Sequence, residues 1–418
     1  MKITHLWALE VLDSRGNPTV RAFLELANGA RVSASVPSGA STGVHEAHEL
    51  RDGDTTRYNG KGVLKAVEHV NTVLAELVVG RDASDQQTID SDMIALDGTQ
   101  HLSRLGANAL LAVSMVVARA GAVAEHTSLY RYLAHLADRP TNSFTLPTPM
   151  MNVLNGGKHA AGASDFQEYM IVPVGATSMI ERVRWGSELF HALGKILADE
   201  GFQTTVGDEG GYAPSLHSNT APLDYALRAI TAAGYTPGTD IALALDTAAS
   251  EFYVNDVYTL STDGTEYSPQ ELTDWYARLL EKYPIISLED GHAQDDWAGF
   301  QDEIKTFGSR VNIVGDDLFV TNPKRIQTGI EMGAANALLV KPNQIGTLTQ
   351  TLEAIKIARG SDYTLVVSHR SGETADTFIA DLAVGVGAEY IKTGSLSRSE
   401  RVEKYNRLLE IERELARF

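Results

Sequence analysis

The sequence predicts an α/β protein with two domains, a smaller N-terminal α+β domain followed by a C-terminal closed barrel of strands and helices. Three observations lead to this prediction. The chain has 418 residues, which is longer than one ordinary hydrophobic core supports. Hydrophobic residues make up 43%, which is typical of a folded soluble protein. The N-terminal part has the pattern of antiparallel strands and then of helices, whereas the remainder repeats a strand followed by a helix.

The N-terminal domain is predicted from residues 3–39, where three short strands are separated by Gly, Asn and Pro, as in an antiparallel meander. Helical spacing of apolar residues follows in 62–80 and 106–126. The second of these segments is so rich in alanine that we expect it to be buried on most sides. Prolines and small polar residues then collect in 135–152, so we place the domains at 1–138 and 139–418.

The barrel is predicted from short apolar runs that each end in a polar residue and precede a helical segment. Such repetition is typical of parallel strands with crossover helices, and six units in a row favour a closed barrel over an open sheet. The polar residues would then share the carboxyl rim, where barrel enzymes carry their chemistry. The six runs are 241–246, 284–290, 311–317, 335–341, 364–370 and 388–394.

Composition excludes several classes of function. A formal charge of -19 opposes any broad affinity for nucleic acid or an anionic membrane, so an anionic substrate needs a local positive site. The absence of cysteine excludes disulfides, thiolate metal sites and thiol nucleophiles. The first residues, MKITHLWALE, lack the apolar core of a signal peptide, and no run of about 18 apolar residues is present. We therefore expect a cytoplasmic protein without a membrane span.

Three acids end successive predicted strands: Asp246, Glu289 and Asp316. Oxygen ligands without cysteine suit Mg²⁺, with water or substrate oxygens completing an octahedron. Each acid alone could instead cap the following helix. Because three occur in consecutive units, the pattern favours a metal site.

Three cations end the next predicted strands: Lys341, Arg370 and Lys392. Cations beside a metal indicate a substrate with several negative charges, such as phosphate and carboxylate, although structural ion pairs with the acids are the alternative. Cations around Lys341 would disfavour its ammonium form, so that it could act as a base near neutral pH.

Two glycine-rich segments offer further polar groups. Residues 204–214 contain Asp208 and Glu209, and residues 152–170 contain His159, Gln167 and Glu168. Glycine lets the backbone approach a ligand closely. Taken singly, however, such residues are more often ordinary turn or surface residues.

A series of sequence blocks along nearly the whole chain carries a family resemblance. In order, the blocks are VLDSRGNPTV, PSGASTG, ELRDGD, GANALLAVS, MMNVLNGGKHA, QEYMIVPVGA, VGDEGGYAP, SLEDG, VGDDLFVTN, NQIGTLT, SHRSGET and IKTGSLSRSER. Through these blocks the chain resembles the enolase (phosphopyruvate hydratase) family. The resemblance implies an N-terminal α+β domain and a modified (β/α)8 barrel of the TIM type, in which the first units break the alternation of strand and helix.

The resemblance implies reversible dehydration of 2-phosphoglycerate to phosphoenolpyruvate with two Mg²⁺ ions per site. Lys341 is similar to the base that removes the C2 proton, and Glu209 to the group that helps the C3 hydroxyl leave. The implied roles of the other residues are as follows: Asp246, Glu289 and Asp316 hold the first Mg²⁺, Ser41 contacts the second, Glu168 and His159 support the reaction, Gln167 contacts substrate, Arg370 and Ser371 with His369 hold the phosphate, and Lys392 pairs with the substrate carboxylate.

The resemblance further implies a homodimer or a higher homo-oligomer built from dimers. The small residues and glycines around Ser38 to Thr42 predict a loop that closes over bound substrate and excludes water. Departures from the family pattern are mild: Pro342 follows the base, and the segment after His159 lacks an expected Asn. Two alternatives stay open. One is another dehydratase or racemase of the wider superfamily, which would usually lack the phosphate-handling segments. The other is a non-catalytic binding role on the same fold.

Overall fold

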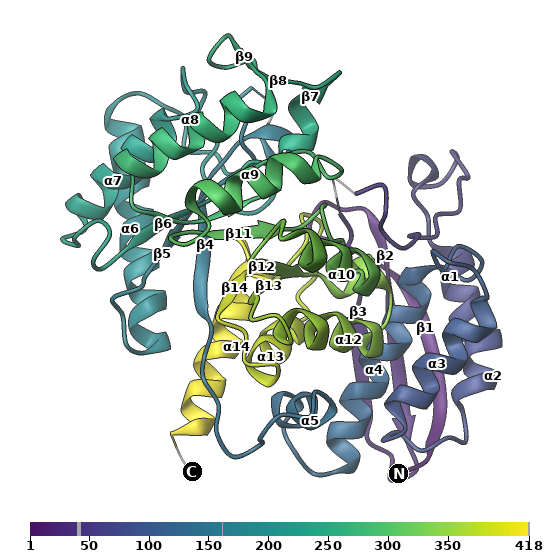
Figure 1. Ribbon diagram of the computed structural model, residues 1–418. Helices are drawn as coiled ribbons and strands as arrows, with labels where there is room; N and C mark the ends of the chain where they lie inside the picture. The colour runs from purple at the N-terminus through teal and green to yellow at the C-terminus, as the bar shows by residue number, and fades with distance from the viewer. Residues whose placement is uncertain (40–42, 161, 417–418) are drawn as a thin grey trace.

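The computed structural model describes residues 1–39, 43–160 and 162–416 (Figure 1). The chain begins with β1 (Ile3–Leu12), β2 (Pro18–Leu26) and β3 (Arg31–Ser35), which form one antiparallel sheet in sequence order. The side chain of Asp13 accepts the backbone N–H groups of Arg15 and Asn17 at 2.8 and 2.9 Å, which fixes the turn between β1 and β2. The predicted meander is confirmed.

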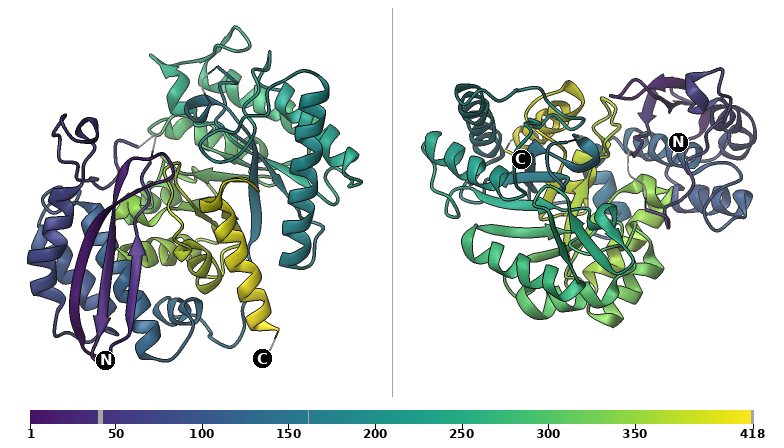
Figure 2. Two further views of the ribbon diagram at one scale, coloured as in Figure 1. Left: turned by 180° about the vertical axis from the view of Figure 1, so that it is seen from behind. Right: turned by 90° about the horizontal axis from the view of Figure 1, so that it is seen from above.

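Helical segments follow this sheet, and those at 64–78 and 107–124 cover one of its faces (Figures 1 and 2). The helical segments are η1 (Tyr58–Gly60), α1 (Leu64–His69), the π-helical turn η2 (Val70–Leu74), α2 (Ala75–Val78), α3 (Gln86–Asp97), α4 (Ala107–Ala124) and α5 (Leu129–Leu136). In the described part of the chain, α4 is the one helix long and apolar enough for a membrane span, but 83% of it is buried inside the protein. It packs on β2 and β3, as the alanine-rich pattern predicts for a core helix.

A closed barrel of eight strands forms the remainder, which confirms the predicted fold class. In barrel order the strands are β10 (Ile285–Glu289), β11 (Asn312–Gly315), β12 (Ala337–Val340), β13 (Thr364–Ser368), β14 (Tyr390–Lys392), β4 (Thr148–Asn155), β5 (Glu168–Val172) and β6 (Ala242–Asp246). The six apolar runs of the sequence are β6 and β10 to β14. β5 runs antiparallel to both β4 and β6, whereas the other neighbours are parallel. This reversal is the modification that the resemblance implies.

Helices surround the barrel, and two of them follow β5 in succession before β6 begins. These are α6 (Met179–Asp199) and α7 (Ala221–Ala232), and the later crossovers contain α8 (Pro269–Lys282), α9 (Trp297–Phe307), α10 (Pro323–Met332), α11 (Pro342–Ile345), α12 (Leu348–Arg359), α13 (Phe378–Gly385) and α14 (Ser399–Leu415). The short elements are η3 (Gly157–His159), η4 (Ala249–Phe252) and a three-stranded sheet of β7 (Tyr253–Val254), β8 (Val257–Leu260) and β9 (Thr265–Tyr267). The small sheet is absent from the sequence-based prediction.

Residues 137–147, which join the two parts of the chain, contain no helix or strand, and the predicted boundary after Asp138 falls within them. The contacts between the two domains lie outside this joining segment. α5 packs on α13. Arg119 of α4 makes a bidentate ion pair with Asp376, at 2.9 and 2.7 Å. Ser38 and Gly372 exchange two backbone hydrogen bonds of 2.7 and 2.8 Å, so the N-terminal domain is fastened to the rim of the barrel.

Candidate active site at the barrel mouth

The alternation of side chains along each strand points the strand-end residues into the barrel. Ala242 and Ala244 belong to the apolar cluster inside the barrel, so Asp246, two residues further, faces the same interior. Ala337 and Leu339 are in that cluster too, and the extended backbone at Lys341 carries the pattern on to its side chain. The same spacing applies to Asp316 and Lys392, two residues after the inward residues Val314 and Tyr390, and Arg370 lies four residues after the inward Val366.

Glu168 lies at the same mouth although its strand, β5, runs in the opposite direction to the others. Met170 and Val172 belong to the interior cluster, and Glu168 is the first residue of β5 rather than the last. Because β5 is antiparallel to its neighbours, its beginning lies beside the carboxyl ends of the others, and Glu168 pairs with Asp246 in the register. The reversal of β5 therefore brings Glu168 into the ring of polar residues.

The ammonium group of Lys392 lies among three buried carboxylates. Its Nζ atom is 2.8 Å from each oxygen of Glu289, 3.1 Å from Glu168 Oε1 and 3.2 Å from Asp246 Oδ2. All four side chains are at most 3% exposed. Burial lowers the pKa of Lys392, but the surrounding carboxylates outweigh it and raise the pKa well above its ordinary value. Lys392 is therefore a fixed internal cation.

Lys341 forms an ion pair with Asp316, whose other oxygen accepts a hydrogen bond of 2.8 Å from Gln344. Burial and the charges of Arg370 and Lys392 lower the pKa of Lys341, but contact with Asp316 outweighs them and raises it. The neighbouring cations thus disfavour the ammonium form as expected, but the expected net lowering of the Lys341 pKa is wrong for this arrangement, because Asp316 outweighs them. A base at Lys341 requires the charge of Asp316 to be engaged elsewhere.

Glu209 lies in the loop after α6, between two histidines. Its Oε1 atom is 3.5 Å from His159 Nδ1 and 3.3 Å from His369 Nε2, and Oε2 accepts a hydrogen bond of 2.9 Å from Asn152. Burial opposes the charge on Glu209, but contact with His369 and the charge of the Arg401 guanidinium favour the carboxylate, and the pKa of Glu209 lies below its ordinary value.

The two histidines and Glu168 beside Glu209, in contrast, favour their uncharged forms. Burial lowers the pKa of both histidines, that of His369 to about 3, so both rings are neutral near pH 7. The Arg401 charge and the N–H of His369 therefore remain to stabilise the Glu209 carboxylate. Burial and the charge of Glu209 raise the pKa of Glu168 well above its ordinary value. Two carboxyl groups in one mouth thus differ in their tendency to hold a proton, as acid and base groups do in enzymes.

Arg370 connects the mouth to the N-terminal domain. Its two terminal nitrogens donate to the carboxylate of Glu46 at 3.0 Å each, and Nη1 also donates to Asn343 at 3.0 Å. Ser371 lines the mouth beside it. Gln167 donates a hydrogen bond of 3.2 Å to Asp246 Oδ2, while its own Oε1 is buried and has no hydrogen-bond partner among the described residues. Ser41 lies outside the described residues.

The donor set fits a hard divalent cation. Asp246 and Glu289 already converge on one cation, the ammonium of Lys392, and they offer only oxygen ligands, as Asp316 does. Glu168 Oε2 is buried without a partner in the described part of the chain. Asp290, Asp316 and Asp317 also lie close enough to share an ion, as do His159, Glu168 and Glu209. The two oxygens of Asp290, however, accept the backbone N–H groups of Asp316 and Asp317 at 2.9 and 2.8 Å, so Asp290 supports the Asp316 turn.

The sequence-based prediction missed four residues of the site: Glu46, Asn152, Asp290 and Arg401. Asp290 directly follows Glu289, a predicted strand-end acid, and this position in the sequence could have indicated that Asp290 belongs to the site. Asn152 lies in β4, and the prolines in and before this strand led to its assignment to the linker. Glu46 and Arg401 reach the mouth from a loop of the other domain and from α14, and no local pattern indicates either contact.

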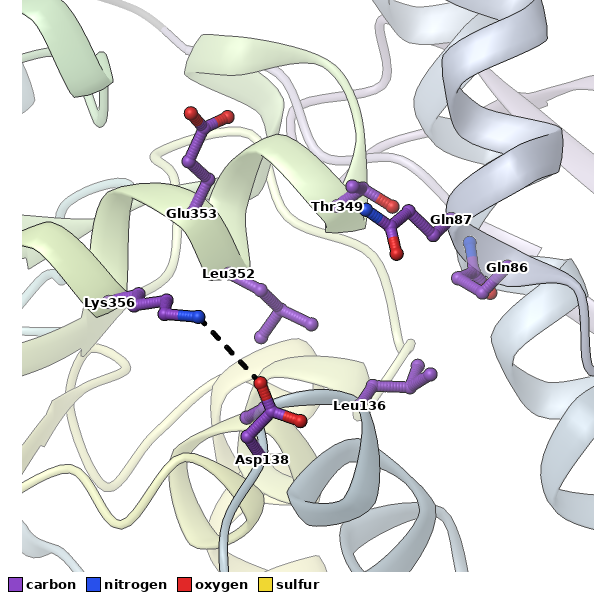
Figure 3. A pocket seen from close by; sticks show the side chains of 9 residues that line it. Gln86, Gln87, Leu136, Asp138, Thr349, Leu352, Glu353 and Lys356 are labelled. Carbon is purple, nitrogen blue, oxygen red and sulfur yellow. Dashed lines mark ion pairs between the residues drawn. The ribbon is translucent and has the colours of Figure 1, made fainter.

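The mouth itself is nearly filled, with a cavity of about 10 Å³. A larger cavity of about 390 Å³ lies between α3, the end of α5 and α12 (Figure 3). Leu136 and Leu352 form its apolar part, and Lys356 and Asp138 face each other across it at 3.8 Å. The side chains of this ion pair are 80% and 85% exposed, so the pair carries little of the chemistry expected of a buried site. The residues that line the mouth are His159, Gln167, Glu168, Glu209, Lys341, Ser368, His369, Arg370, Ser371 and Lys392.

These features define a class of protein: a barrel enzyme whose mouth joins buried carboxylates to buried cations and is partly closed by a second domain. Family models match both parts of the chain, the enolase N-terminal domain over residues 3–133 and the enolase C-terminal TIM barrel domain over residues 143–418. The chain therefore belongs to the enolase family. Membership makes it a lyase of the enolase superfamily and implies a divalent metal ion, which the acidic mouth fits.

Proposed function

We propose that this chain is a phosphopyruvate hydratase, which removes water from 2-phosphoglycerate to give phosphoenolpyruvate and catalyses the reverse reaction in glycolysis and gluconeogenesis. The observation that carries the proposal is the convergence of Lys341, Lys392 and Arg370 on one buried mouth. A substrate with both phosphate and carboxylate needs cations at more than one point. Lys392 would pair with the carboxylate, and Arg370 with Ser371 would hold the phosphate.

In the forward reaction the Lys341 amine takes the C2 proton, and the C3–O bond then breaks as the hydroxyl leaves with a proton to form water. Lys341 follows β12, whereas Glu209 comes from the loop after α6, so the base and the carboxylate that assists the hydroxyl come from different elements of the mouth. Glu209 assists the departing hydroxyl, with Glu168 and His159 beside it. The raised pKa of Glu168 makes it a reservoir for that proton.

Two Mg²⁺ ions, the first held by Asp246, Glu289 and Asp316 and the second by Ser41, would supply positive charge beside the substrate carboxylate, whose charge grows when the C2 proton leaves. If Asp316 ligated such an ion, its carboxylate would no longer hold Lys341 in its charged form. Burial and the charges of Arg370 and Lys392 then favour the neutral amine that the reaction requires.

The test follows the absorbance of phosphoenolpyruvate formed from 2-phosphoglycerate, with and without Mg²⁺. Lys341→Ala should abolish both turnover and exchange of the C2 proton with solvent deuterium, because exchange needs only the first step. Glu209→Gln should impair loss of the hydroxyl far more than exchange. If Lys341 served only in a structural ion pair, folded Lys341→Ala would exchange at a nearly normal rate, and that result would reject the assignment.

The proposal extends to a cytoplasmic location and to assembly as a homodimer or a ring of dimers. Both parts rest on the family resemblance. Sedimentation equilibrium of the purified chain tests the assembly, and a monomer at micromolar concentration would contradict it.

A further inference from the structure

The guanidinium of Arg401, the third residue of α14, is fully buried behind the barrel mouth. It donates hydrogen bonds to three backbone carbonyls, those of Arg370 and Ser371 at 2.6 Å and that of Asp208 at 3.0 Å. One side chain therefore joins the loop that follows β13 to the loop that carries Glu209. The chain leaves room for it at Gly394, where an added Cβ would lie 2.8 Å from Arg401 Cδ.

A fourth contact of Arg401 determines the chemistry of a neighbouring ring. Nη1 lies 2.6 Å from Nδ1 of His369. A guanidinium is only a donor and stays protonated in proteins, so Nδ1 must be the acceptor and carries no proton. A neutral imidazole has one N–H, which is then on Nε2.

His369 Nε2 faces the mouth. It is 3.3 Å from Glu209 Oε1, and the described residues offer it no hydrogen-bond acceptor in good alignment. The other tautomer would present a lone pair to the Glu209 carboxylate, which would repel it. The geometry thus gives the mouth a neutral N–H donor beside the Glu209 carboxylate.

We propose that Arg401 is a positioning residue that fixes His369 as the neutral Nε2–H tautomer and thereby presents a hydrogen-bond donor to an oxygen atom of the anionic substrate. The identity of that substrate rests on the proposed function. The assignment of the tautomer does not rest on the proposed function, because it follows from contacts within the chain.

The direct test is nitrogen NMR of the whole protein labelled with ¹⁵N-histidine. The signals of His369 are identified as those missing from the His369→Gln variant. In the wild type, Nδ1 should have the shift of an unprotonated ring nitrogen and Nε2 that of an N–H, at neutral pH and without ligand. A proton on Nδ1, or on both nitrogens, would overturn the proposal whatever the variants do.

Arg401→Met removes the donor, and Arg407→Met is the matched control because it removes another arginine of α14, one that pairs with Asp381 at 2.9 Å. In Arg401→Met the two His369 signals should move toward each other as the tautomers exchange, and kcat should fall about 10²-fold, the scale of a misplaced active-site group. Arg407→Met should leave both readouts at the wild-type value. A folded Arg401→Met with an unchanged Nε2–H tautomer would refute the role of Arg401.

The two proposals can fail separately. A wild type with the Nε2–H tautomer but no formation of phosphoenolpyruvate supports the role of Arg401 and rejects the proposed function. If Arg401→Met does not fold, the wild-type spectrum alone decides the tautomer.

Discussion

Lys392 should stabilise the metal-free protein by balancing the charges of Glu168, Asp246 and Glu289. Removing one partner of a buried ion pair destabilises by about 3–5 kcal/mol. A second route gives the same size, because protonating one carboxylate with an ordinary pKa near 4.3 at pH 7 costs about 3.7 kcal/mol. Lys392→Met should therefore lower the free energy of unfolding in EDTA by about 3–5 kcal/mol.

The corresponding shift in melting temperature follows from chain length. Unfolding entropy of about 2.1 cal/mol/K per residue gives about 0.9 kcal/mol/K for the 418 residues, so Lys392→Met should melt about 3–6 °C lower. Mg²⁺ should raise the melting temperature of the variant more than that of the wild type, because the ion then replaces the missing ammonium beside Asp246 and Glu289.

The assay is thermal unfolding by circular dichroism in EDTA and in excess Mg²⁺. Lys195→Met is the matched control, because Lys195 is 75% exposed and pairs with Asp199 on the surface of α6, where such pairs contribute little. Equal melting temperatures of wild type and Lys392→Met in EDTA would refute the charge balance. A smaller response of the variant to Mg²⁺ would refute the link between the lysine and the metal.

Three further predictions concern the metal, the pH dependence and the packing. EDTA should abolish turnover and added Mg²⁺ should restore it, since the ligands are all oxygens; full activity in metal-free buffer would contradict this. The pKa of Asp82 is lowered to about 2 by the N-terminal amine and Ser84, so its stabilisation is present above the unfolded pKa of 3.8 and disappears as the pH falls through about 2. Asp82→Asn should accordingly cost about 0.5–1 kcal/mol at pH 6, discounted because the carboxylate is partly exposed, and nothing once the pH is well below 2; a constant difference in urea titrations across this range would be inconsistent with it. Gly121→Ala should destabilise by about 1–3 kcal/mol, because its Cβ would collide with the Tyr132 hydroxyl, and an unchanged urea midpoint would show that α4 and α5 can separate at this point.

Sequence patterns predicted the parallel part of the barrel because each strand there is an apolar run with a polar residue at its carboxyl end. β5 has the reverse order, with Glu168 before its apolar residues, so the same rule passes over it. β4 contains Pro149, which usually argues against an interior strand, although here it pairs with Ile391 of β14. The pattern of an apolar run followed by a polar residue therefore predicted neither β4 nor β5. The family resemblance alone indicated an irregular start to the barrel.

The candidate site was predictable where a residue's position along a strand determines its direction. Asp246, Asp316, Lys341 and Lys392 all reach the mouth in this way. The protonation of Lys341 was not predictable, because it depends on which neighbour lies closest, and only the structure shows that this is Asp316. The same holds for the contact of Arg401 with His369, which joins a helix to a loop 32 residues away in the sequence.

The connection between the two domains has a consequence for the integrity of the mouth. The linking segment is exposed at Thr141, Asn142 and Ser143, whereas the paired backbone of Ser38 and Gly372 and the bidentate contact of Glu46 with Arg370 lie at the rim. The peptide segment between the domains therefore only connects them, and the contacts at the rim hold the residues of the mouth in place. A chain nicked within 141–143 should remain a two-fragment complex with its mouth intact, and the two halves should be able to find each other when expressed as separate polypeptides.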